Sequence, residues 1–114
     1  ILLFATPTGS TAYSLSAGGP ILAPKMECIL MTPVCPHSLF SRSVLFSGES
    51  ELSVHVKIPE ECCCVLTIDG EKNVPVLATD RVVIRKSDLK LKLALLHNRN
   101  FYKLLNEKLK ERDF

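Results

Sequence analysis

The chain has 114 residues, of which 46% are hydrophobic and 23% are charged. These proportions exclude a disordered, collagen-like or fibrous protein and predict one globular domain. The formal net charge is only +2, and the basic residues are scattered rather than clustered, which argues against a nucleic-acid partner. A chain of this size buries roughly two-thirds of its unfolded surface, so its core needs neither disulfides nor a metal.

Cellular location is indicated by the apolar runs and the cysteines. The longest apolar runs, at residues 1–5 and 74–78, are far shorter than the ~20 residues that span a bilayer, and no secretory n-region precedes the first. Cys62, Cys63 and Cys64 are consecutive, which suits a disulfide framework poorly because neighbouring side chains of a strand point to opposite faces. With no Cys-x-x-Cys pair for a metal, we expect reduced thiols, no membrane partner and a cytoplasmic protein.

The first apolar run begins at Ile1 without an initiator methionine or a preceding turn, which indicates a segment of a longer polypeptide. Residues 1–5 predict a buried strand, and the turn residues at 6–9 end it. A short helix is expected over residues 12–17. Either Ser10 or Thr11 would serve as its N-cap, and Gly-Gly-Pro would stop it.

Further strands are predicted along the rest of the chain. An apolar strand is expected at 28–31, and alternating strands are expected over 52–58 and 81–85. A strand at 65–68 ends in Asp69-Gly70, a strong hairpin-turn signal. The leucine-rich stretch 89–96 reads as a last strand, apolar enough to be covered on both faces and so to suit a subunit interface.

A terminal helix is expected after Asn100, where apolar residues recur at helical spacing. Short strands separated by turns predict an antiparallel arrangement rather than a parallel sheet with crossover helices. The expected fold class is therefore mainly β (α+β). We expect an antiparallel β-sandwich-like domain with a short helix after the first strand and a C-terminal helix.

The densest polar cluster lies at the first strand-to-helix turn. Seven hydroxyl side chains fall within residues 6–16: Thr6, Thr8, Ser10, Thr11, Tyr13, Ser14 and Ser16. Free N–H groups at a helix start attract anions, and hydroxyls bond ribose and phosphate, so the cluster suggests a sugar or phosphate site. The alternative is that these hydroxyls only bond their own backbone. Neither a P-loop nor a Gly-x-Ser-x-Gly pattern is present.

The order of residues 6–13, Thr-Pro-Thr-Gly-Ser-Thr-Ala-Tyr, resembles the signature of NAD kinases, and residues 14–20 continue it in the family manner. A second stretch at 32–39, Thr-Pro-Val-Cys-Pro-His-Ser-Leu, is similar to another segment of that family. Asp69-Gly70 looks like a third landmark. The resemblance covers most of the chain, with residues after about 80 matching in pattern only.

The resemblance implies an enzyme that transfers the terminal phosphoryl group of ATP, or of polyphosphate, to the adenosine-ribose 2′-hydroxyl of NAD with a divalent cation such as Mg²⁺. Ser16 would contact the nicotinamide-ribose side. His37 would lie near a subunit interface, in a dimer or tetramer, and Asp69 is a second-tier site residue. The residues that would line the NAD site are Thr8, Thr11, Ala12 and Tyr13.

Family enzymes also carry an N-terminal nucleotide-binding domain. It contains a Gly-Gly-Asp-Gly motif, whose Asp is the proposed base, and an Asn-Glu or Asn-Asp pair; these 114 residues have neither. The resemblance therefore implies that residues 1–114 are the C-terminal domain, inactive without their N-terminal partner domain. The alternatives are a related lipid-kinase-type domain, which should show a wide apolar pocket, and a non-catalytic nucleotide-binding or interaction module.

Overall fold

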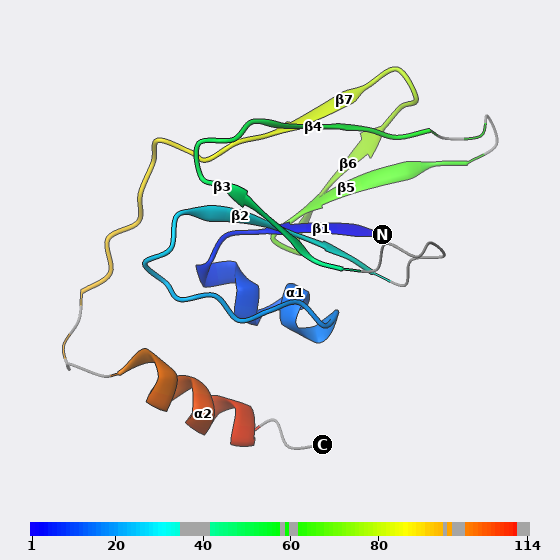
Figure 1. The fold of residues 1–114 in the computed structure, drawn as a ribbon. Helices are drawn as coiled ribbons and strands as arrows, with labels where there is room; N and C mark the ends of the chain where they lie inside the picture. The colour runs from blue at the N-terminus through cyan, green and yellow to red at the C-terminus, as the bar shows by residue number, and fades with distance from the viewer. Residues whose placement is uncertain (35–41, 58, 60–61, 95, 97–99, 112–114) are drawn as a thin grey trace.

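The computed structural model describes residues 1–34, 42–57, 59, 62–94, 96 and 100–111 (Figure 1). Its elements in chain order are β1 (Leu2–Ala5), the 3-10 helix η1 (Thr8–Thr11), α1 (Tyr13–Ser16), β2 (Cys28–Pro33), β3 (Val44–Ser47), β4 (Leu52–His55), β5 (Cys64–Ile68), β6 (Lys72–Val76), β7 (Arg81–Ile84) and α2 (Phe101–Glu111). The strands pair in small antiparallel sheets with few helices, which confirms the predicted fold class. Among these elements no helix is long and apolar enough to cross a membrane.

One three-stranded sheet, in the order β1-β2-β3, supports the polar turn. The central strand β2 pairs with β1 through Phe4 opposite Met31 and with β3 through Ile29 opposite Phe46. Leu30 is fully buried and Leu22 is 4% exposed, so the core lies along β2 and the connection that leads to it. In Figure 1, η1 and α1 lie beside this sheet, directly after β1.

Two antiparallel two-stranded sheets complete the described β structure. Strands β4 and β7 pair around Val54 opposite Val82, and the alternation of half-buried and exposed residues in β4 confirms the predicted period of two. Strands β5 and β6 form the predicted hairpin at Asp69-Gly70. Both residues have positive φ, 52° and 72°, as a type I′ turn requires.

The predicted helix over residues 12–17 is only partly confirmed. The chain first forms η1 and then the single turn α1, with Ala12 at the N-cap position and no side-chain cap. The expectation that Ser10 or Thr11 caps α1 is wrong. The Ser10 hydroxyl bonds Pro7 and Leu22 instead, which leaves it unable to serve the helix start.

The predicted strand at 89–96 is wrong over the described residues 89–94 and 96, which form no ladder. Leu89, Leu91 and Leu93 are 88%, 85% and 76% exposed. In Figure 1 this segment, coloured yellow to orange, leaves β7 and runs to α2 away from the sheets. A strand needs a neighbour to accept and donate its backbone hydrogen bonds, so the alternating pattern alone does not form one.

The terminal helix is confirmed as α2. Its N-cap is Asn100, whose Oδ1 accepts hydrogen bonds from the backbone N–H groups of Tyr102 at 2.9 Å and Lys103 at 3.3 Å. This is the capping geometry expected of an asparagine before a helix. The apolar residues Phe101, Leu104 and Leu105 are half-buried and the rest of the helix is exposed.

The cysteine run does not lie within one strand. Cys62 and Cys63 precede β5 and are exposed, and only Cys64 belongs to the strand. The premise that the three side chains alternate across a strand is therefore wrong. Cys28, in β2, is half-buried like Cys64, and all four are free thiols. Cys35 lies outside the described residues.

Candidate functional site

The hydroxyl-rich turn is held by hydrogen bonds between its side chains and the backbone. Ser10 is fully buried; its hydroxyl donates to the carbonyl of Pro7 at 2.7 Å and accepts from the N–H of Leu22 at 3.1 Å. The Thr6 hydroxyl accepts from the N–H of Gly9 at 3.0 Å. The alternative reading, that these hydroxyls bond the backbone, therefore holds for Thr6 and Ser10.

A second set of hydroxyls ties α1 to the sheet. The Ser14 and Thr32 hydroxyls, each 2% exposed, lie 2.9 Å apart, and the Thr32 hydroxyl lies 3.0 Å from that of Ser43. Gly19 packs against this pair, because a β-carbon there would lie 2.9 Å from Thr32 Oγ1 and closer still to Ser14 Oγ. The sequence did not predict this series of hydrogen-bonded hydroxyls, because Ser14, Thr32 and Ser43 come from separate segments.

We expect Ser14→Ala to lower the free energy of unfolding by about 1–2 kcal/mol, because it removes a buried hydrogen bond between α1 and β2. The matched control is Ser16→Ala, the same substitution at an exposed position of α1, which should change stability by no more than about 0.5 kcal/mol. Urea unfolding of both variants measures the difference. Equal midpoints for the two would contradict the anchoring role of Ser14.

The remaining positions of the turn face solvent. Thr8, Ala12 and Ser16 are exposed, and Tyr13 is 67% exposed. Thr11 is half-buried, and its hydroxyl lies 3.5 Å from the carbonyl of Thr8. The five residues predicted to line the site thus belong to the consecutive elements η1 and α1 and the Ala12 link between them, and they are accessible to a ligand. The cluster divides into buried anchors and an open surface.

The structure also brings the turn at Asp69-Gly70 to this surface through Gly70. A β-carbon placed on Gly70 would lie 2.7 Å from the Tyr13 hydroxyl and 3.3 Å from its ring carbon Cε2. The β5–β6 turn therefore touches Tyr13, so the third sequence landmark meets the first in space. The second meets the continuation of the first through Thr32 and Ser14. The other landmark residue with an expected role, His37, lies outside the described residues. Within the described part of the chain, no three His, Cys, Asp or Glu side chains are grouped so as to hold a metal ion.

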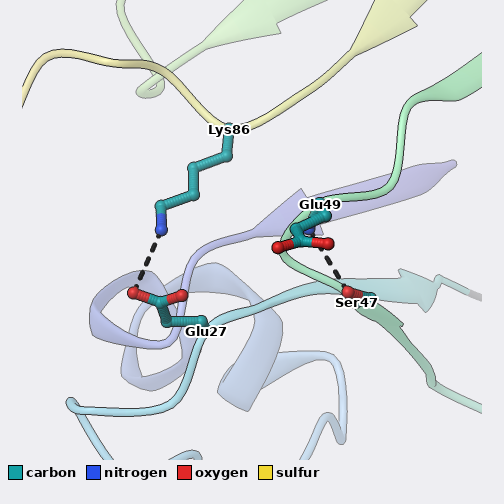
Figure 2. A network of polar contacts seen from close by, with 4 residues as sticks. All are labelled: Glu27, Ser47, Glu49 and Lys86. Carbon is teal, nitrogen blue, oxygen red and sulfur yellow. Dashed lines mark hydrogen bonds and ion pairs between the residues drawn. The ribbon is translucent and has the colours of Figure 1, made fainter.

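A separate polar region lies between the β3–β4 connection and the segment after β7. It is an open depression of about 460 Å³, lined on one side by residues 48–51 and on the other by residues 85–88 and Lys90. Figure 2 shows the nearby contacts: Lys86 pairs with Glu27 at 3.2 Å, and the Glu49 N–H donates to the Ser47 hydroxyl at 3.3 Å. None of the predicted site residues lines it, and its charges are of both signs.

Comparison with known proteins supports the family resemblance that the motif at residues 6–13 indicates. Residues 2–96 match the model of the ATP-NAD kinase C-terminal domain. The chain belongs to this family. Over 110 residues it is 44% identical to the NAD kinase of Carboxydothermus hydrogenoformans, and over 108 residues 45% identical to that of Magnetococcus marinus. These alignments cover 96% and 95% of this chain but 39% and 35% of those family members.

A solved relative supports the fold of the family. The chain is similar to the crystal structure of yeast NADH kinase complexed with NADH, with a TM-score of 0.54 and 44% sequence identity. The match covers 69% of this chain and 21% of that one. The chain therefore spans well under half the length of the family members named here.

Proposed function

We propose that this chain is the substrate-binding domain of an NAD kinase, which transfers the terminal phosphoryl group of ATP or polyphosphate to the 2′-hydroxyl of the adenosine ribose of NAD. The observation that carries the proposal is the family motif at residues 6–13. Its buried hydroxyl, Ser10, anchors the turn, while Thr8, Thr11 and Tyr13 remain accessible beside the β5–β6 turn.

The proposed roles follow this division. Thr8, Thr11, Ala12 and Tyr13 line the NAD site, and Ser16 contacts the nicotinamide-ribose side. Hydroxyls and backbone groups at such a surface discriminate NAD by hydrogen bonds, since a compound without the ribose or amide groups leaves donors and acceptors unpaired. Asp69 is a second-tier residue at the edge of this surface, and His37 would lie near a subunit interface.

The catalytic base is assigned to the N-terminal domain that the family resemblance implies. A ribose hydroxyl is a poor nucleophile at neutral pH and needs a positioned carboxylate, whereas phosphoryl transfer itself depends mainly on alignment and neutralisation of charge. The hydroxyls of Thr8, Thr11 and Ser16 orient a substrate but do not deprotonate it. A divalent cation such as Mg²⁺ would accompany ATP, and no residue of the described part is assigned to hold it.

The same proposal includes a cytoplasmic enzyme that assembles as a dimer or tetramer. The exposed leucines of the segment after β7 support a subunit interface, because a group of such exposed apolar side chains is uncommon on an isolated domain. Sedimentation velocity on the full-length enzyme tests the assembly, and a monomer at all concentrations would remove this part of the proposal.

The activity is tested by measuring NADP formation from NAD, ATP and Mg²⁺ with the full-length enzyme, alongside phosphorylation of diacylglycerol. NADP formation supports the proposal. Lipid phosphorylation would favour the lipid-kinase alternative, although the depression at residues 48–51 is lined by charged and polar side chains rather than a wide apolar pocket. NAD binding without turnover would favour a non-catalytic nucleotide-binding module.

A further inference from the structure

The contact between Tyr13 and the β5–β6 turn joins two sequence landmarks that are far apart in the chain. An ideal β-carbon on Gly70 would meet the Tyr13 hydroxyl at 2.7 Å, Cε2 at 3.3 Å and Cζ at 3.4 Å. No real β-carbon tolerates the first of these distances, so the ring occupies space that only a glycine leaves free. The absence of a side chain at position 70 is therefore a condition for the observed placement of Tyr13.

The turn is itself held in one conformation. Asp69 and Gly70 both have positive φ, and the Glu71 N–H donates to the Ile68 carbonyl at 3.1 Å. Across the hairpin, the Thr67 hydroxyl donates to Asn73 Oδ1 at 2.9 Å. These contacts support the backbone of the turn relative to β5 and β6, so the turn presents a defined surface to Tyr13.

The other end of the contact is anchored as well. Tyr13 precedes Ser14, whose buried hydroxyl bonds Thr32 on β2. The backbone of Tyr13 is thus fixed by the sheet while its ring, 67% exposed overall, is limited on one side by the turn. A tyrosine has only two side-chain torsions, and restricting them before a ligand arrives reduces the entropy lost on binding.

We infer that Gly70 is a positioning residue for the substrate: it lets the β5–β6 turn hold the Tyr13 ring in the orientation in which it meets NAD. This inference rests on the proposed function, because it assigns Gly70 a part in the same NAD site. It makes Gly70 act through Tyr13 and not by touching the substrate. A substitution at residue 70 would then change the KM for NAD and leave the KM for ATP unchanged.

The decisive variant is Gly70→Ala in the full-length enzyme. Its new methyl group displaces the Tyr13 ring, so the KM for NAD should rise about 5- to 10-fold while the KM for ATP stays unchanged. The matched control is Gly18→Ala. Gly18 has a similar φ of 87° but nothing within 4 Å of its added β-carbon, so this variant carries the backbone strain without the clash. Its KM for NAD should stay within twofold of the parent.

A second comparison isolates the clash. In the Tyr13→Phe background the atom nearest to the added methyl is gone, and the remaining approaches of 3.3 and 3.4 Å are tight but tolerable. In that background, Gly70→Ala should therefore raise the KM for NAD at most twofold. An equal cost in both backgrounds, or an equal effect of Gly70→Ala and Gly18→Ala, would overturn the positioning role.

A crystal structure keeps the inference testable if Gly70→Ala does not fold. In the parent enzyme, with and without NAD, the Tyr13 hydroxyl should stay against Gly70; a ring that turns away from Gly70 when NAD binds overturns the inference. Failure of the proposed function would give a result distinct from failure of this inference: the parent enzyme itself would neither bind NAD nor form NADP.

Discussion

The 114 residues alone should form no detectable NADP from NAD, ATP and Mg²⁺. The accessible side chains of the proposed site, such as Thr8 and Thr11, position a ribose but supply no base and no cradle for a triphosphate. NAD binding by the isolated chain should also be weak, because an open surface does not enclose the substrate or exclude water. NADP produced per enzyme over time, for the isolated chain and the full-length enzyme, measures the effect.

Supplying the N-terminal domain, in one chain or as a complementing piece, should restore NADP formation. Changing the Asp of its Gly-Gly-Asp-Gly motif to Asn should then abolish most turnover and leave NAD binding largely intact, which separates the base from the binding surface. Robust turnover by residues 1–114 alone would contradict this division of roles. The base would then lie within this chain, and Asp69→Asn would be the first variant to test, since Asp69 adjoins Gly70, which lies against Tyr13.

Tyr13→Ala in the full-length enzyme should weaken NAD binding by about 1–3 kcal/mol, roughly 5- to 150-fold, because a stacked or hydrogen-bonded contact is lost. The melting temperature should change little, since two-thirds of the Tyr13 side chain already faces solvent. Isothermal titration with NAD and a thermal melt measure the two effects separately.

The matched control is Tyr102→Ala. Tyr102, on α2, is 64% exposed against 67% for Tyr13, so the two substitutions remove equally exposed rings. Only the Tyr13 variant should lose NAD affinity. Unchanged affinity together with a collapsed melting temperature would show that Tyr13 serves the fold rather than the substrate.

The elements that the sequence predicts correctly are those that local chemistry determines. Asp69 and Gly70 tolerate positive φ, so the hairpin follows from two residues. Asn100 caps α2 through its own side chain. Strand β6 escaped prediction because Pro75 interrupts its pattern; it is tolerated there since β6 pairs with β5 alone. The prediction of a strand at 89–96 failed for a different reason: the alternating pattern is strong, but within the described residues no strand pairs with it.

The candidate site was only half predictable from the sequence. The motif identified the turn, but seven hydroxyls within residues 6–16 do not reveal which of them bond within the fold. The change from η1 to α1 at Ala12 decides that Ser10 and Ser14 point inward while Thr8 and Tyr13 stay accessible. The proximity of Tyr13 to Gly70 depends on how the hairpin packs against α1, which no local pattern encodes.

The exposed leucines after β7 have a consequence for how the isolated chain behaves in solution. Leu89, Leu91 and Leu93 are exposed and alternate in the sequence with Lys90 and Lys92. Exposed apolar side chains invite association, while lysines oppose it by charge repulsion that salt screens over about 10 Å at 0.1 M. Light scattering from the isolated chain should therefore rise with both protein and salt concentration, and Leu91→Lys should suppress the rise.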